Sequence, residues 1–193
     1  MIHQSAYQHS YFANCISLGC DCTIASSMQT IGIRSFAGPF DWSTSSSLPR
    51  LLSIIESDFK DFLKEDHLVP ISIRGVVQFT DLKYDFRYPH DLRESLFDEY
   101  EGIRQKYQRR IDRFREATKS PTAFIRAICN EEEITYINRN RAYIERIIKK
   151  GNPENEIVFM RGHQIPEGSP GPSWGNCLPL AKWDASLGGN QLW

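Results

Sequence analysis

The chain passes from a short apolar stretch into a helical pattern within nine residues, Ser17-Leu18-Gly19-Cys20-Asp21-Cys22-Thr23-Ile24-Ala25. Apolar side chains then recur at helical spacing up to Gly32, namely Ile24, Ala25, Met28 and Ile31. Because Asp21 can cap this helix, Cys22 falls in its first turn. The pattern predicts a strand, a glycine turn and a helix that begins at a cysteine.

The remaining apolar patterns alternate between helix and strand. They predict helices over about 48–63, 92–115 and 131–150, and strands within 71–90, 122–128 and 157–160. We therefore expect one α/β (α+β) domain over residues 1–193. Residues 1–13 are expected to form an N-terminal tail. Residues 161–193 are expected to form a Gly/Pro/Trp-rich segment anchored by Trp174, Trp183 and Trp193.

Composition excludes several classes of protein. The 193 residues are 40% hydrophobic and 24% charged, which is typical of a soluble globular domain. The net charge of −1 gives no reason to expect a nucleic-acid partner. No apolar run approaches the ~18 residues of a membrane span, and the N-terminus lacks a secretory signal. We expect a cytoplasmic protein.

The five cysteines are an odd number, and three of them lie within eight residues, which does not resemble a disulfide framework. In a reducing compartment we expect mostly free thiols. A zinc site built from Cys15, Cys20 and Cys22 with Cys177 or His163 lacks the paired Cys-x-x-Cys spacing of structural zinc. We therefore expect no metal and no cofactor.

Cys22 is the leading candidate for a nucleophile. The unpaired N–H groups and the positive dipole end of a helix start favour thiolate over thiol. The same N–H groups could stabilise an oxyanion when sulfur attacks a carbonyl. The alternative is a structural cysteine at a helix start.

His90 is the leading candidate for a base. It ends an aromatic strand pattern and precedes a helix, a position from which side chains often project into a cleft, and cysteine nucleophiles usually depend on a histidine that the fold brings close. The alternative is a capping or surface histidine.

Arg126 interrupts an apolar strand, so it requires a carboxylate or an anion as partner. Asp41, Asp91 or an acidic group of a substrate could fill that role. The basic residues of the helix over 92–115 are expected to form a solvated face, with a phosphate site as the alternative. The sequence contains no P-loop and no dinucleotide fingerprint.

Several ordered motifs together resemble a bacterial family of unknown function that is described as papain-like cysteine peptidases. The motifs are Ser17-Leu18-Gly19-Cys20-Asp21-Cys22-Thr23-Ile24-Ala25, Ser35-Phe36-Ala37-Gly38-Pro39-Phe40-Asp41-Trp42, Asp58-Phe59-Lys60-Asp61-Phe62-Leu63, His90-Asp91 and Phe124-Ile125-Arg126. The resemblance covers about residues 14–160. It implies a papain-like domain in which the helix carrying the cysteine packs on a mostly antiparallel sheet.

The resemblance places Cys22 and His90 at the positions of nucleophile and base. A papain-like site also needs a residue that orients the histidine, and Asp41, Asn130 and Asp91 are the candidates. We choose Asp41, because Asp91 directly follows His90 and would point to the opposite face of a strand. Trp42 and Arg126 are expected to contact the substrate.

The sequence thus predicts a cysteine-dependent hydrolase, peptidase-like or amidase-like, or an acyltransferase. It would act on a peptide or another carbonyl compound. One alternative is a non-catalytic papain-like binding module of a bacterial polysaccharide or effector system. Another is an enzyme that binds a sugar phosphate or a nucleotide.

Overall fold

A computed structural model describes residues 12–161 and 178–179. The helices are α1 (Thr23–Thr30), α2 (Leu48–Glu56), α3 (Leu96–Ala117), α4 (Glu131–Arg139) and α5 (Arg141–Ile148), with a 3-10 turn, η1, at Glu65–His67. The strands are β1 (Asn14–Ser17), β2 (Thr44–Ser45), β3 (Leu68–Ile73), β4 (Val76–Asp81), β5 (Phe86–Tyr88), β6 (Thr122–Ala127), β7 (Glu156–Arg161) and β8 (Leu178–Pro179). The α/β fold class expected from the sequence is confirmed.

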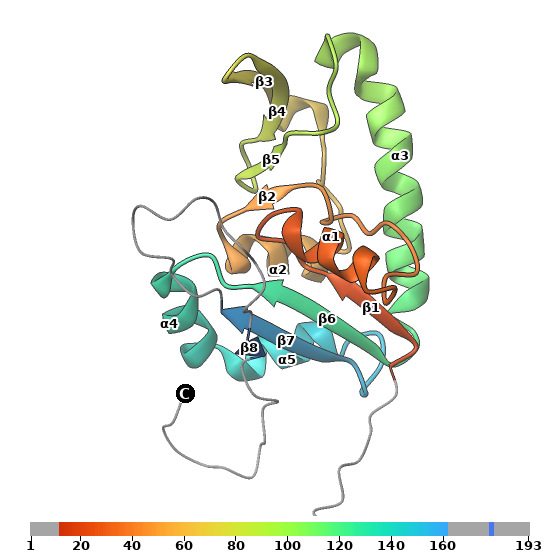
Figure 1. Ribbon diagram of the computed structural model, residues 1–193, viewed down its shortest axis with the longest axis vertical. Helices are drawn as coiled ribbons and strands as arrows, with labels where there is room; N and C mark the ends of the chain where they lie inside the picture. The colour runs from red at the N-terminus through yellow and green to blue at the C-terminus, as the bar shows by residue number, and fades with distance from the viewer. Residues whose placement is uncertain (1–11, 162–177, 180–193) are drawn as a thin grey trace, which may run out of the picture.

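One sheet has the order β1-β6-β7-β8, and its first three strands run parallel. Because side chains alternate along a strand, Phe124 and Ile125 of β6 face opposite sides. Ile125 packs with α1 in one apolar cluster, whereas Phe124 belongs to the main core. Helix α1 therefore covers one face of this parallel sheet, as Figure 1 shows. The helix that begins at the cysteine was expected on an antiparallel sheet, and this expectation is wrong.

The second sheet is antiparallel, with the order β2-β5-β4-β3. Strands β3 and β4 pair along six residues each, from Leu68 opposite Asp81 to Ile73 opposite Val76. Strand β2 is only two residues long and pairs with β5, Thr44 opposite Arg87 and Ser45 opposite Phe86. This short edge strand matters for the site, because it lies between the segments that carry the two candidate catalytic residues.

Helix α3 joins the two sheets and runs beside both of them in Figure 1. Near its middle, Tyr107 makes an edge contact with Tyr88 of β5, with ring centroids 5.5 Å apart. In its last turn, the ring of Phe114 lies 5.8 Å from that of Phe124 of β6. Aromatic rings between these contacts, including Phe40, extend the same core. The two sheets therefore share one hydrophobic core.

Two predicted helices are shorter than their apolar patterns suggested. Helix α2 begins at Leu48 as expected, with Ser47 as its N-cap, but ends at Glu56, because positive φ angles at Asp58 and Phe59 turn the chain. Phe59 nevertheless remains buried. The helix predicted over 131–150 is divided at Asn140, the residue between α4 and α5. The side-chain amide of Asn140 donates a hydrogen bond to the Tyr136 carbonyl at 2.8 Å.

The expected tail at 1–13, apart from its last two residues, and the expected anchoring by Trp174, Trp183 and Trp193 lie outside the described residues. Within the described part of the chain, no helix has the length and apolar character that a membrane crossing requires.

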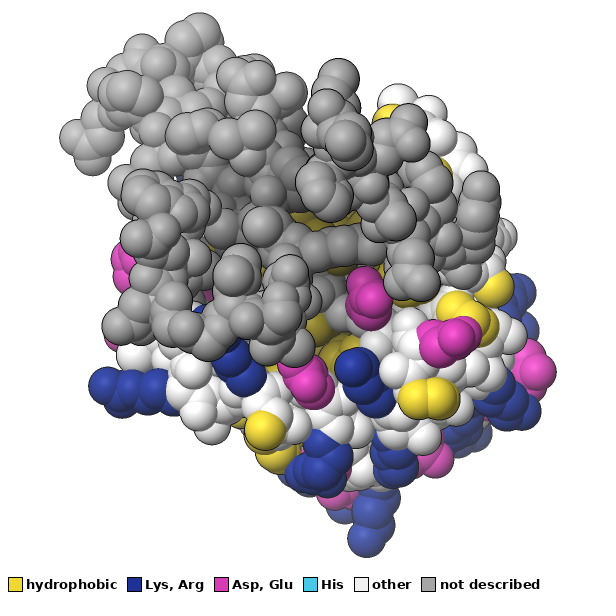
Figure 2. Space-filling model, turned by 90° about the horizontal axis from the view of Figure 1, so that it is seen from below, with side chains coloured by type: hydrophobic (Ala, Val, Ile, Leu, Met, Phe, Trp, Pro, Cys, Tyr) yellow, Lys and Arg dark blue, Asp and Glu magenta, His cyan; other side chains and the backbone are white. Residues whose placement is uncertain are grey.

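The face in Figure 2 carries Lys and Arg side chains interspersed with Asp and Glu. This mixture agrees with the nearly neutral net charge.

Candidate functional site

The turn between β1 and α1 explains the Ser-Leu-Gly motif. Ser17 is buried, and its hydroxyl accepts a hydrogen bond from the Gly19 N–H at 3.1 Å. Gly19 has a φ of +72°, which favours glycine. A Cβ atom at this position would also lie 3.3 Å from the Phe40 carbonyl oxygen. The motif therefore sets the path of the chain into Cys22.

Cys22 is the N-cap residue of α1 and is half-buried with a free thiol. Asp21 Oδ1 accepts a hydrogen bond from the Thr23 N–H at 2.8 Å, which is the capping role expected for this aspartate. The helix begins one residue later than the sequence predicted. Cys22 thus lies at the helix start with its thiol partly accessible, which is the placement that a nucleophile requires.

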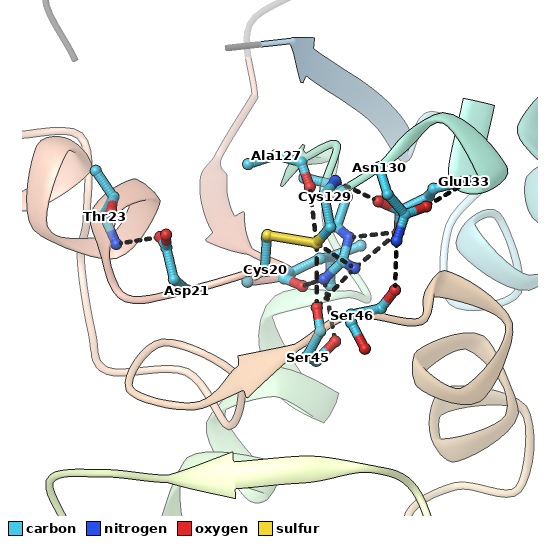
Figure 3. The surroundings of a disulfide bond; sticks show 12 residues. Cys20, Asp21, Thr23, Ser45, Ser46, Ala127, Cys129, Asn130 and Glu133 are labelled. Carbon is cyan, nitrogen blue, oxygen red and sulfur yellow. Dashed lines mark hydrogen bonds and ion pairs between the residues drawn. A yellow bond between two sulfur atoms is a disulfide. The ribbon is translucent and has the colours of Figure 1, made fainter. Parts of the chain in front are cut away.

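A disulfide between Cys20 and Cys129 joins the turn before Cys22 to the turn after β6 (Figure 3). The two residues are 109 positions apart in the sequence, and their Cα atoms lie 6.0 Å apart. Because β1 and β6 are parallel neighbours, their carboxyl ends meet at one edge of the sheet. The expectation of free thiols at these two positions is wrong, and Cys20 is not available for the three-thiolate zinc set.

Arg126 pairs with Glu133 of α4, so both expected partners, Asp41 and Asp91, are wrong. Its Nη2 lies 2.7 Å from Glu133 Oε1, and both side chains are at most 2% exposed. Burial lowers the pKa of the guanidinium, and the Glu133 carboxylate opposes that effect. The arginine sits close to the disulfide, because Nη2 also lies 3.3 Å from Cys129 Sγ.

The remaining hydrogen bonds of the Arg126 guanidinium also go to protein groups. Nε donates to Glu133, Nη1 donates to the Leu18 carbonyl at 2.9 Å, and Nη2 donates to the Ser45 carbonyl at 3.1 Å. These contacts tie β6 to the end of β1, to β2 and to α4. They argue against the expected contact of Arg126 with an acidic group of a substrate.

Asp41 lies in the Gly-Pro-Phe-Asp-Trp motif and is 2% exposed. Its Oδ2 accepts hydrogen bonds from the Gly38 N–H at 2.8 Å and from Arg34 Nε at 2.9 Å. Burial raises the pKa of this carboxyl, and the contacts with Gly38 and Arg34 oppose the rise. The motif therefore forms a closed loop held together by one buried carboxylate.

Trp42 follows Asp41 and contacts His90. The two rings meet edge to face, with centroids 6.3 Å apart at 89°. On the Cys22 side, the carbonyl of Cys20 accepts a hydrogen bond from the Ser45 N–H at 2.9 Å. The segment from Trp42 to Ser45 therefore borders both the turn that leads to Cys22 and the histidine.

The structure brings the candidates together only in part. His90 is exposed, and within the described residues no hydrogen bond joins its ring to Cys22 or to Asp41. Asp91 is buried and accepts a hydrogen bond from the Tyr107 hydroxyl at 2.6 Å. Asn130 caps α4 by accepting from the Glu133 N–H at 2.9 Å. Asp91 and Asn130 thus have structural partners of their own.

No group of three His, Cys, Asp or Glu side chains capable of holding a metal occurs in the part of the chain that the structure describes. His163 and Cys177, the proposed fourth ligands, lie outside it.

Three cations of α3 pair with carboxylates: Arg104 with Glu101, Lys106 with Asp91 and Arg115 with Asp58. These pairs favour the solvated, charge-balanced face expected for this helix over a phosphate site.

Sequence reasoning missed Arg34, Cys129 and Glu133. Glu133 had a signal, because Asn130 and Glu133 have the spacing of a capping box. The structure differs from that box, since the Glu133 carboxylate accepts from the Cys129 N–H at 2.7 Å and pairs with Arg126. For Arg34 and Cys129 the sequence carries no signal, because their partners become neighbours only through the fold.

These features define a mixed α/β domain with a half-buried cysteine at a helix start. The family model described as "Putative papain-like cysteine peptidase (DUF1796)" matches residues 13–164. The chain belongs to this family. The expected resemblance is therefore confirmed at the level of the family.

The chain is also similar to "Uncharacterized protein R408" of Acanthamoeba polyphaga mimivirus, with 30% identity over 119 residues. The match covers 51% of this chain and 53% of the relative, so the chain spans about half the length of that protein. This relative is viral, and the comparisons do not support the bacterial origin expected from the motifs. No solved structure matches the chain.

Proposed function

We propose that this protein is a cysteine-dependent hydrolase or acyltransferase in which Cys22 is the nucleophile and His90 is the base. One observation carries the proposal. The segment around β2 contacts both the turn that leads to Cys22, through Ser45, and the ring of His90, through Trp42. Membership of the papain-like family supports the same assignment.

The proposed reaction starts when His90 removes the proton of the Cys22 thiol and the sulfur attacks a carbonyl carbon. N–H groups of the first turn of α1 would stabilise the oxyanion that forms. His90 then returns the proton to the leaving group, and water or another acceptor releases the acyl group from sulfur. A peptide or another amide or ester would serve as substrate.

Asp41 keeps the proposed role of orienting the base, through intermediate residues. Its carboxylate contacts Arg34, and Trp42 lies between Arg34 and His90. The half-buried Trp42 ring, next to the exposed His90, would offer apolar area to a substrate. We also keep the cytoplasm as the proposed location, where reducing conditions would hold the Cys20–Cys129 pair largely in its thiol form and the disulfide would form on oxidation.

Acylation by p-nitrophenyl acetate, followed by mass spectrometry of peptides, tests the proposal. We expect an acetyl group on Cys22 that forms rapidly and is then lost by hydrolysis. His90→Ala should slow its formation by about 100-fold, the lower end for a general base. Cys22→Ala should abolish turnover, whereas Cys15→Ala, which removes the other free thiol among the described residues, should retain it.

Acetylation of Cys22 and Cys15 at equal rates, insensitive to His90→Ala, would contradict the catalytic proposal. Burial raises the pKa of the Cys15 thiol, so this cysteine is a suitable internal reference for a slow thiol. In that case a non-catalytic binding module of the same fold becomes the better account. The phosphate-binding alternative has lost its main support, because Arg126 is occupied by protein groups.

A further inference from the structure

Arg34 lies between α1 and β2, and its side chain is only 10% exposed. The chain folds back at this point, since the N–H groups of Ile33 and Arg34 both donate to the Met28 carbonyl, at 3.0 and 3.3 Å. This turn directs the Arg34 side chain toward the Gly-Pro-Phe-Asp-Trp loop. An arginine withdrawn from water to this extent needs several partners.

The guanidinium of Arg34 uses three nitrogens for two separate segments. Nε and Nη2 lie 2.9 and 2.8 Å from Asp41 Oδ2. Nη1 donates to Gln29 Oε1 at 2.7 Å. Gln29 belongs to α1, the helix that begins after Cys22. Arg34 therefore fastens the loop containing Asp41 to the helix that carries the proposed nucleophile.

The same guanidinium lies over the Trp42 ring. Arg34 Cζ lies 5.2 Å from the centre of the Trp42 ring, which is the distance of a cation–π contact. Trp42 in turn contacts His90 edge to face. Arg34, Trp42 and His90 thus form a continuous series of packed groups.

We infer that Arg34 is a positioning residue that sets the placement of His90 relative to Cys22, by holding Asp41 and Gln29 with its nitrogens and by its cation–π contact with Trp42. This inference rests on the proposed function for its catalytic consequence. Lysine is not equivalent to arginine here, because its ammonium is a single point charge that does not reproduce the planar fork with which separate nitrogens reach Asp41 and Gln29.

The test compares Arg34→Lys and Arg34→Gln with Arg104→Gln. Arg104 is a matched control, because it also contacts a carboxylate with two nitrogens. Its Nε and Nη2 donate to the Glu101 carboxylate at 2.9 and 3.1 Å. This pair lies on an exposed surface of α3. Two quantities are measured in each protein. The first is the set of NMR signals from the His90 ring in histidine-labelled protein, which the His90→Gln variant assigns. The second is the rate of Cys22 alkylation by iodoacetamide as a function of pH.

We expect Arg34→Lys to shift the His90 ring signals and to slow Cys22 alkylation near neutral pH by about threefold, a smaller effect than that of His90→Ala because the base is displaced and not removed. Arg104→Gln should change neither quantity. Arg34→Lys retains charge and length, so it keeps the test valid if Arg34→Gln fails to fold.

Unchanged His90 signals and an unchanged alkylation profile in folded Arg34→Lys would overturn the inference. A wild-type alkylation profile that does not respond to His90→Ala would instead overturn the proposed function. The NMR signals would still decide in that case whether Arg34 places the His90 ring, so the two failures are distinguishable.

Discussion

Arg126 and Glu133 form an ion pair that is almost completely removed from water, with exposed fractions of 0% and 2%. The guanidinium also donates to Leu18 and Ser45, so one side chain connects the ends of β1, β2 and β6. Removing one partner of such a pair leaves a buried charge without compensation, which costs much more than the pair itself contributes. Arg126 therefore supports the candidate site indirectly, by holding the backbone at the ends of β1 and β6 and at β2.

Glu133→Gln tests this role of the pair. We expect the free energy of unfolding to fall by about 3 kcal/mol, because the Arg126 charge would remain buried without a carboxylate. Urea denaturation measures the change. Glu116→Gln is the control, since Glu116 forms an exposed pair with Lys119 and its loss should cost no more than about 0.5 kcal/mol. Similar losses in the two variants would show that the Arg126 pair is not structurally critical.

At the scale of elements, the disulfide between Cys20 and Cys129 joins two turns at the same edge of the parallel sheet. One turn leads into α1 and the other into α4 (Figure 3). The cross-link restricts the unfolded chain over a loop of 109 residues, and such long loops give large entropic effects. The bond therefore favours the folded state, in which the turn before Cys22 lies beside the turn after β6.

Cys129→Ser should lower the free energy of unfolding by about 2–4 kcal/mol under oxidising conditions. Thermal or urea unfolding of wild type and variant, each with and without a thiol reductant, measures the effect. In the reductant the wild type loses the same cross-link, so the difference between the two proteins should largely disappear. A difference that persists unchanged would mean that the Cys129 side chain contributes by packing and not by cross-linking.

The elements that depend on local patterns could be predicted from the sequence. The starts of the helices at about residues 48 and 131 and the glycine turn at Gly19 were predicted in place. The break at Asn140 was not predicted, because apolar spacing continues across it and the hydrogen bond from its side-chain amide to the Tyr136 carbonyl gives no apolar pattern.

The candidate site was less predictable, because its contacts join segments that are distant in the sequence. The apolar strand context of Arg126 indicated a buried partner, but not which carboxylate would supply it. The pairing of β1 with β6 brings Cys20 close to Cys129, and the sequence of either segment alone does not predict it. The placement of Trp42 against His90 similarly follows from the pairing of β2 with β5.

At the scale of the whole molecule, the two sheets share one aromatic core around α3. Phe114 contacts Phe40 at 6.1 Å and Phe124 at 5.8 Å, while Tyr107 reaches Tyr88 at 5.5 Å. Because neither sheet has a separate core of comparable size, the described part of the chain should unfold as one unit.

Phe114→Ala should lower the free energy of unfolding by about 3–5 kcal/mol, since it removes a large buried ring. Amide hydrogen exchange then reports whether β4 and β6, one strand from each sheet, lose protection together. We expect equal losses in both strands. Loss confined to β6 would show that the sheets are separate units and that α3 does not couple them.

The central claim is that Cys22 and His90 act as a pair, and the pH dependence of Cys22 alkylation tests it most directly. Peptide mapping after iodoacetamide treatment gives the rate for Cys22 and Cys15 separately, in wild type and in His90→Ala. We predict that Cys22 reacts faster than Cys15 near neutral pH, and that His90→Ala slows the reaction of Cys22 by about tenfold, which corresponds to about 1.4 kcal/mol. Coincident profiles for Cys22 in both proteins would contradict the pair and with it the catalytic account.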